Sequence, residues 1–276
     1  MGDILKAKKA VYEWLIKNKM DYLLICIVAL IGSGLTLFSG FGLGTLLVPV
    51  FALFFPIEVA ISLTAIVHFL NNLFKLVLVG KHANRKVVVN FGVPAIVFAF
   101  LGAFLLTQLT NLQPLHQYSI GSKMFVIMPV KLVIGILLMA FSLFEVVPRL
   151  ANLQFSQKYL TLGGALSGFF GGLSGNQGAL RSAFLLRANL SKESFIASGV
   201  VIACLIDVSR LTIYGKQIFA AEEQFNYSLI IAATLSAFAG AFIGNKLLKK
   251  ITIKGLQYSV AGMLFVFAIL LVAGII

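Results

Sequence analysis

Long apolar stretches, separated by short polar segments, make up most of this chain. The apolar stretches reach about 20 residues and do not alternate as barrel strands do, so they are long enough to cross a bilayer as helices. The first one, Tyr22–Phe55, is longer. As one straight helix it would run about 50 Å, against a hydrocarbon core of roughly 30 Å. It must therefore be broken or steeply tilted, and Pro49 favours a break.

Glycine interrupts the apolar pattern in two stretches, Gly32–Phe54 and Gly163–Leu186. The second holds about seven glycines between Gly163 and Gly178, and each would cost a helix interior roughly 1 kcal/mol relative to alanine. A full charge, Arg181, follows within the same stretch. Irregular backbone at membrane depth must be buried in protein or line a wet cavity. The pattern therefore predicts a broken helix at a transport site.

The two glycine-rich stretches indicate an internal duplication. Ser39-Gly40 and Ser174-Gly175 are 135 residues apart, and the same separation places Glu58 on Glu193 and Lys75 on Arg210. Rare charged residues seldom coincide at one fixed separation by chance. We therefore predict an all-α polytopic membrane protein with two four-segment internal repeats, whose glycine-broken helices meet near the bilayer middle.

The predicted divisions are an amphipathic helix at 1–20 on the cytoplasmic interface, a first transmembrane repeat at 21–148, a linker at 149–158 and a second transmembrane repeat at 159–276. Four segments per half give about eight crossings, but this count places the lysines between Lys246 and Lys254 outside. Re-entrant hairpins with inverted repeats would place them inside, and would move the basic N-terminus or the Lys81 loop outside. Both arrangements remain open.

Composition narrows the class of protein. The 276 residues are 60% hydrophobic and 11% charged, whereas about a quarter of a soluble domain is charged. The net charge of +13 lies mostly in loops and termini, where it orients a membrane protein against the cytoplasmic leaflet instead of binding nucleic acid. The sequence has no nucleotide-binding loop, no metal-ligand spacing and no nucleophile–base pair. We expect neither an enzyme nor a cofactor or metal site.

Two predicted helices carry polar stripes, which in membrane helices turn toward the bundle interior. At helical spacing the first carries Thr64, His68, Asn71, Asn72 and Lys75, and the second Asp207, Arg210 and Tyr214. Asp207 and His68 are candidates for proton coupling because both titrate. Other interpretations remain open: Lys75 can snorkel to the interface, His68 can be a satisfied core residue, and Asp207 can merely neutralise Arg210.

Arg181 is the strongest candidate for binding an anion. A half-helix starting near Ser174 would aim free backbone N–H groups at the break, and the Arg181 guanidinium adds a planar fork of donors. The alternative is a structural ion pair between Arg181 and Asp207. The predicted substrate-binding residues are Arg181, Asn176, Gln177, Ser174, Asn71, Asn72, Lys75, Arg210, Ser39 and Gly40.

From Leu24 to Ile276 the sequence resembles the TauE/SafE sulfite exporter family, also called the 4-toluene sulfonate uptake permeases. Ser39–Gly44 with Pro49 matches the first motif of the family, and Leu173–Gly178 stands at the second. The second copy departs from the usual triple glycine and proline. The resemblance implies transport of sulfite, sulfoacetate, other organosulfonates or related small anions, without ATP and coupled to the proton gradient.

The expected function is a secondary transporter for small sulfur-containing anions in a bacterial inner membrane. An anion channel with the same basic pore and a permease for small carboxylates are alternatives. A membrane-embedded assembly subunit or enzyme is disfavoured, because the polar residues lie within the bundle and not on a large exposed domain. The expected partners are a small anionic substrate and the lipid bilayer, with a possible homodimer and no nucleic acid.

Overall fold

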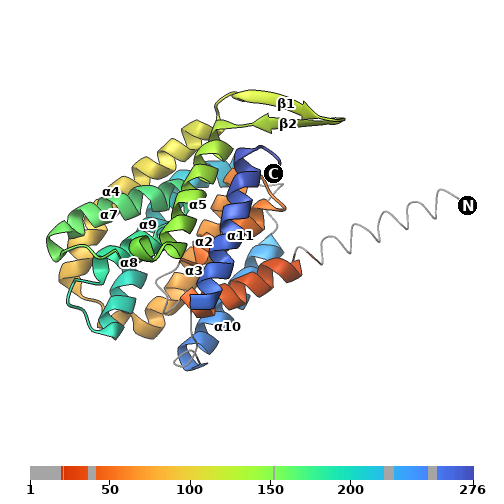
Figure 1. Ribbon diagram of the computed structural model, residues 1–276. Coiled ribbons are helices and arrows are strands. Elements are labelled where there is room, and N and C mark those ends of the chain that lie inside the picture. Colours follow the sequence, from red (N-terminus) through yellow and green to blue (C-terminus); the bar gives the residue numbers. More distant parts are fainter. Residues whose placement is uncertain (1–19, 21, 37–41, 152, 221–226, 248–253) are drawn as a thin grey trace, which may run out of the picture.

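The computed structural model describes residues 20, 22–36, 42–151, 153–220, 227–247 and 254–276. Within these ranges the chain is a bundle of helices with one short β hairpin (Figure 1). The elements are the helix Tyr22–Thr36, α2 Leu43–Ala52, α3 Ile57–Val79, η1 Gly80–His82, α4 Arg85–Thr110, β1 His116–Ile120, β2 Lys123–Ile127, α5 Pro129–Val146, α6 Pro148–Ala151, η2 Gln157–Tyr159, α7 Leu160–Ser174, α8 Gly178–Leu185, α9 Lys192–Ala220, α10 Tyr227–Leu247 and α11 Lys254–Val272.

The prediction of an all-α polytopic membrane protein is confirmed. In the described part of the chain, four helical stretches are long and apolar enough to cross a membrane: Ile57–His82, Arg85–Thr110, Lys192–Gly215 and Tyr227–Gly244. Shorter apolar helices accompany them, including one at Pro129–Phe144. The predicted helix at 1–20 lies outside the described residues, apart from Met20.

The glycine-rich stretch of the second half is broken as predicted. Helix α7 ends at Ser174, Gly175 adopts a left-handed conformation with φ of 80°, and α8 begins at Gly178. Helix α8 then returns toward the start of α7, because the Phe184 ring packs directly against Gly163 and stacks on Phe155 with ring centroids 4.3 Å apart. The pair α7–α8 is therefore a helical hairpin that enters and leaves at the same end of the bundle.

The first half contains a similar hairpin. A Cβ atom placed on Gly32, near the end of the helix Tyr22–Thr36, would lie 3.0 Å from Leu43 at the start of α2. Ile25, earlier in that helix, shares a core cluster with Phe51 at the end of α2. The two helices therefore run in opposite directions. Of the two arrangements that the sequence leaves open, these hairpins correspond to the re-entrant one.

Small residues allow the hairpins to pack closely against long helices. A Cβ atom on Gly168 of α7 would collide with the carbonyl oxygen of Ala95 on α4, and one on Gly240 of α10 would collide with the carbonyl oxygen of Leu30. Small residues at helix contacts are typical of membrane bundles, where close backbone approach supplies the attraction. Helix α7 is thus fixed along α4, and the helix Tyr22–Thr36 along α10.

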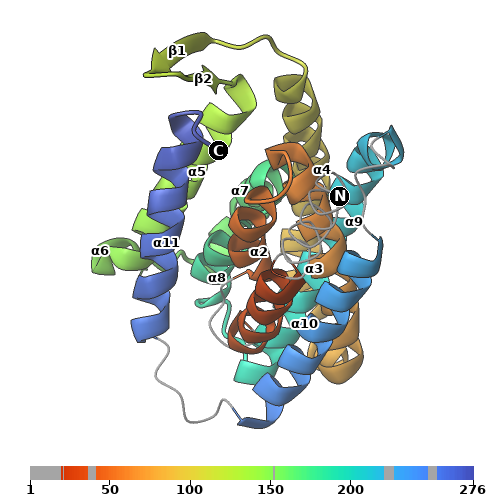
Figure 2. The ribbon, with the colours of Figure 1, turned by 90° about the vertical axis from the view of Figure 1, so that its right-hand side faces the viewer.

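The β hairpin lies at one end of the bundle, beside the C-terminus (Figures 1 and 2). Its strands pair with Tyr118 opposite Phe125, whose rings stack with centroids 5.3 Å apart. The Tyr118 hydroxyl donates a 2.6 Å hydrogen bond to the carbonyl oxygen of Ala273. This contact ties the connection between α4 and α5 to the end of α11. The sequence pattern did not predict these strands.

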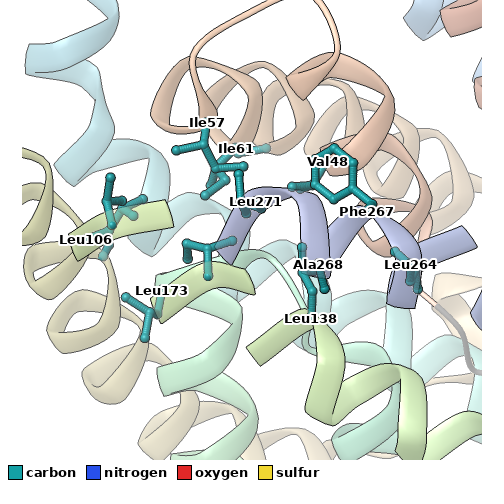
Figure 3. Packing of buried hydrophobic residues seen from close by; sticks show 14 of the residues in the cluster. Val48, Ile57, Ile61, Leu106, Leu138, Leu173, Leu264, Phe267, Ala268 and Leu271 are labelled. Atoms are coloured by element: carbon teal, nitrogen blue, oxygen red, sulfur yellow. The ribbon is translucent and has the colours of Figure 1, made fainter. Parts of the chain in front are cut away.

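An apolar core, shown in Figure 3, extends from this end of the bundle toward the middle of α5 and α11. It joins the start of α3, the end of α4, the start of α5 and the end of α11, with Ile57, Leu106, Ile134 and Leu271 among its buried members. Tyr214 of α9 also belongs to it, and its hydroxyl donates a hydrogen bond to the carbonyl oxygen of Gly172. The end of the bundle at which the β hairpin lies is called the hairpin end below. Packed apolar side chains close it.

Candidate functional site

Asp207 on α9 is a buried carboxylate that forms hydrogen bonds with side chains from several parts of the bundle. One carboxylate oxygen lies 2.6 Å from His68 Nδ1 and 3.3 Å from Asn72 Nδ2, both on α3. The other oxygen accepts from Arg210 Nε at 3.0 Å and from Gln177 Nε2 at 3.4 Å. Asp207 thus contacts α3, the break between α7 and α8, and its own helix. The two predicted polar stripes do face each other.

These contacts decide between two of the sequence-based alternatives. Arg210 is the ion-pair partner of Asp207, with Nη2 2.8 Å from Oδ1, and both side chains are fully buried. Asp207 therefore does neutralise Arg210, and it also bonds His68. The alternative ion pair between Arg181 and Asp207 does not form, since Gln177 lies between them. Apart from this ion pair, Arg210 Nη1 and Nη2 have no hydrogen-bond partner in the described structure.

Arg181 sits on α8, one turn after the break. Its Nη1 donates a 3.1 Å hydrogen bond to Gln177 Oε1, and its Nε passes within 3.4 Å of where a Cβ on Gly199 would stand. Among the residues that the structure describes, no carboxylate lies within 4.0 Å of this guanidinium. Most of the guanidinium donors of Arg181 therefore remain available for an anion.

Lys75 does not snorkel to the membrane interface. It is only 4% exposed and lies on the inner face of α3. With the Asn71 amide oriented to satisfy its neighbours, the oxygen of Asn71 accepts from Lys75 Nζ at 3.2 Å and the nitrogen donates to the carbonyl oxygen of Ala237. An ammonium group has three donors. Within the described chain no carboxylate pairs with Lys75 either.

Both cations line one cavity of about 40 Å³. Helix α3 contributes His68, Asn72 and Lys75, helix α8 contributes Arg181 and Ser182, and α9 contributes Gly199 and Val200. The lining includes no carboxylate among the described residues. The cavity lies toward the end of α3 and the beginning of α9, opposite the hairpin end. One water molecule needs roughly 10–15 Å³ of cavity volume, so a cavity of about 40 Å³ holds roughly three water-sized groups.

The remaining predicted residues stand around this cavity without lining it. Asn176 donates to the Ser174 hydroxyl at 3.3 Å, and its own oxygen is buried without a partner in the described structure. Asn71 contacts Lys75 and Arg210 contacts Asp207, but neither residue lines the cavity. Gln177 reaches the cavity through Arg181. Ser39 and Gly40 lie outside the described residues.

The start of α2 touches the break between α7 and α8, beside Arg210. A Cβ atom on Gly44 of α2 would lie 3.0 Å from the carbonyl oxygen of Gly175, and one on Gly175 would lie 3.0 Å from Arg210 Nη1. The lack of a side chain at both positions lets the backbones meet beside the buried charges. Gly44 belongs to the first glycine-rich stretch, whereas Gly40, where the first break was predicted, lies outside the described residues.

The sequence pattern missed two hydroxyl residues of the cavity, Thr36 and Ser182. Ser182 follows Arg181 directly, and Thr36 ends the helix Tyr22–Thr36 next to the first glycine-rich motif. The available signal was a hydroxyl within an apolar run near a break. That signal is weak, because such hydroxyls commonly bond to their own helix, as Ser174 does to Phe170.

A bundle of apolar helices with two helical hairpins and a buried cationic cavity is typical of membrane transport proteins. The family model "Sulfite exporter TauE/SafE" matches residues 24–271. The chain therefore belongs to the TauE/SafE family of multi-pass membrane transporters, a family of transporters and not of enzymes. A comparison with curated proteins finds no match.

Proposed function

We propose that this protein is a proton-coupled secondary transporter of sulfite or small organosulfonates across a bacterial inner membrane. One observation carries the proposal. Lys75 and Arg181 are buried cations that face the same cavity, and no carboxylate among the described residues pairs with either. Charged side chains inside a membrane protein are costly, and unpaired ones mark substrate pathways. The missing counter-charge is a small anion.

The size of the cavity favours a compact oxyanion. About 40 Å³ accommodates roughly three water-sized groups, which restricts the cavity to a small anionic head group. A planar carboxylate offers two oxygens, which one arginine fork satisfies. Three oxygens need donors from several directions, and here Lys75 approaches from α3, Arg181 from α8 and the imidazole of His68 from α3. This supports a sulfur oxyanion over a carboxylate.

The one-sided position of the cavity favours a transporter over a channel. The cavity lies toward the ends of α3 and α8, whereas the hairpin end is filled by the apolar core around Ile57, Ile134 and Leu271. A channel needs a continuous wet path, but a transporter needs access from one side at a time. The arrangement supports a site that is closed toward the hairpin end.

The basic residues indicate which compartment this is. Lys81, Arg85 and Lys86 lie at the cavity end between α3 and α4, and they are exposed. Other basic residues lie in short elements, connections or helix ends there: Arg149, Lys158, Arg187, Lys192 and Lys246. Toward the hairpin end the described residues include Lys123 and Lys216. Short loops rich in Lys and Arg face the cytoplasm. This distribution supports a cavity on the cytoplasmic side.

The two halves support an inverted internal repeat. Helices α2 and α8 begin at Leu43 and Gly178, and α3 and α9 begin at Ile57 and Lys192; both separations equal the 135 residues between Asn72 and Asp207. Within the described ranges, each half contains a helical hairpin followed by three longer helices. A hairpin and three crossings reverse the direction of the second half, as in many secondary transporters.

Proton coupling is assigned to His68 and Asp207. They share a 2.6 Å hydrogen bond, and His68 also lines the cavity. A proton bound by this pair adds positive charge beside the anion, so each ligand favours the binding of the other. The coupling is reciprocal, and a proton gradient can therefore drive the anion.

Flux into proteoliposomes tests the proposal. Purified protein is reconstituted, a pH gradient is imposed, and uptake of sulfite, sulfoacetate, taurine, sulfate and acetate is compared. We expect sulfite or a sulfonate to accumulate above its external concentration, and to stop accumulating when a protonophore collapses the gradient. A channel would equilibrate the anion without concentrating it. Preferred transport of acetate would favour the carboxylate permease.

A further inference from the structure

The side chain of Gln177 connects the anion cavity to the buried carboxylate. Its Oε1 accepts a 3.1 Å hydrogen bond from Arg181 Nη1, and its Nε2 donates to Asp207 Oδ1 at 3.4 Å. Its backbone is fixed separately, because its carbonyl oxygen accepts from the Ser167 hydroxyl at 3.1 Å and from the Arg181 N–H at 3.0 Å. Gln177 is 1% exposed. The amide thus links two charged groups from a rigid backbone position.

The amide has only one orientation that fits both partners. A guanidinium has donors only, so it must face the amide oxygen. An ionised carboxylate has acceptors only, so it must face the amide nitrogen. While Asp207 is ionised, its charge holds the amide in place, and the amide oxygen in turn holds one donor of Arg181. An oxyanion in the cavity competes with this oxygen for the same donor.

We infer that Gln177 is the positioning residue through which the charge of the Asp207–His68 pair controls Arg181. The inference rests on the proposed proton-coupled anion transport. With the pair unprotonated, Gln177 holds Arg181 Nη1 away from the anion. When the pair takes up a proton, the net negative charge that faces Gln177 Nε2 falls, so the hydrogen bond from Gln177 weakens and the whole Arg181 fork becomes available. Proton binding thereby strengthens anion binding, and Gln177 reduces binding of the anion without a proton.

Other charged and titratable groups lie near the His68–Asp207 pair and contribute to the electrostatic field around it. Those in electrostatic contact with His68 or Asp207 are Lys75 on α3, Arg181 on α8, and Cys204, Arg210 and Tyr214 on α9. Their direct field also couples the proton to the anion, with or without Gln177. A test must therefore separate the hydrogen-bonded link from this field, and substitutions of Gln177 that keep its volume do so.

The test measures binding of methanesulfonate by calorimetry in detergent at about pH 5.5 and about pH 7.5, on either side of the range in which histidine changes charge. The sulfonate itself does not titrate there. We expect wild-type protein to bind at least about threefold more tightly at the lower pH. At about pH 7.5, Gln177→Met should bind methanesulfonate about threefold more tightly than wild type. The ratio of its affinities at the two pH values should be smaller than that of wild type.

Gln177→Glu should shift binding in the opposite direction. Its ionised carboxylate pairs permanently with Arg181, so binding at about pH 7.5 should fall at least about tenfold below wild type. When it is protonated, its carbonyl and hydroxyl reproduce the pattern of the amide, and binding at about pH 5.5 should recover. Ser167→Ala is the matched control. It removes a bond to the backbone carbonyl of Gln177 and leaves the side-chain link, so its pH ratio should equal that of wild type.

Several results would overturn the inference. Gln177→Met could bind more weakly than wild type at both pH values while the ratio of its two affinities is unchanged. In that case Gln177 is an ordinary ligand or a packing residue. Gln177→Met identical to wild type would remove it from coupling. A gain of binding cannot come from misfolding, so a poorly folded variant does not imitate the expected result. Wild-type protein that binds neither methanesulfonate nor sulfite would instead overturn the proposed function, and this inference with it.

Discussion

Asn72 on α3 donates a hydrogen bond to Asp207 on α9, and the two residues are 135 positions apart. The same separation relates Ser39 to Ser174 and the start of α3 to the start of α9. Residues related by a two-fold axis touch each other only near that axis. The contact therefore places Asp207 where the two proposed repeats meet, and where relative movement of the halves acts on it most directly.

Replacing Asp207 by Asn should uncouple transport from the proton gradient. The amide keeps the shape of the side chain but removes the charge that pairs with His68 and Arg210. We expect sulfonate binding to persist and gradient-driven accumulation in proteoliposomes to be lost. His68→Ala should have the same effect. Proton-driven flux that is unchanged in both variants would remove this pair from the mechanism.

The Asp207→Asn variant also needs a control for folding. It leaves the fully buried Arg210 without a counter-charge, and breaking a buried pair costs about 3–5 kcal/mol. The double variant Asp207→Asn/Arg210→Gln removes both charges together and should fold better than the single one. If the double variant is folded and still concentrates the anion in a pH gradient, Asp207 serves only to neutralise Arg210.

Replacing Lys75 by Met should weaken anion binding at least about tenfold, because one charge-assisted hydrogen bond contributes roughly 1.5–3 kcal/mol. Stability should not fall, since the ammonium is buried with Asn71 as its partner and the Met side chain is similar in length. Lys131→Met is the matched control: Lys131 lies on α5 and does not line the cavity. Equal binding of both variants would exclude Lys75 from the site.

Adding a single methyl group at Gly168 should destabilise the bundle. The Cβ of Gly168→Ala would collide with the carbonyl oxygen of Ala95, so α7 and α4 must separate. Overpacking of this kind costs about 1–3 kcal/mol. Gly262→Ala on α11 has no atom within 4 Å of the new Cβ and should be neutral or stabilising. Thermal unfolding in detergent compares the two, and equal melting temperatures would contradict the close packing.

Much of the fold follows from the sequence because its causes are local. Apolar runs of helical length predict the long helices, and the glycine run predicts the break at Gly175, which has φ of 80°. The direction after the break could not be predicted. A crossing and a hairpin contain the same glycines, and the choice depends on the packing of Phe184 against Gly163, residues on two different helices.

The partners of the buried charges were only partly predictable. Asp207 and Arg210 stand at i and i+3 on one helix, a spacing that brings side chains together, whereas Arg181 reaches Asp207 only through Gln177. The β hairpin was missed for another reason. Its strands of five residues are mostly exposed, and Tyr118 is fixed by the carbonyl oxygen of Ala273, which lies far along the chain. Such contacts leave no periodic signal.

Arg181 allows the sharpest test of the anion site. A transport site must release its cargo, so we expect wild-type affinity for a sulfonate in the micromolar to millimolar range, about −4 to −8 kcal/mol. Arg181→Ala removes a planar fork that has no carboxylate partner in the described structure, and binding should weaken at least about tenfold. Arg181→Lys should recover only part of this loss, because the charge returns without the fork.

These Arg181 variants should fold, because the only described side chain that accepts a hydrogen bond from Arg181 is Gln177. Folding is checked by size-exclusion chromatography and thermal unfolding, and binding is then measured by calorimetry with methanesulfonate. Arg187→Ala is the matched control, since Arg187 is an exposed arginine nearby that bonds Gln154 and does not line the cavity. If Arg181→Ala folds and binds as tightly as Arg187→Ala, Arg181 is structural and the anion binds elsewhere.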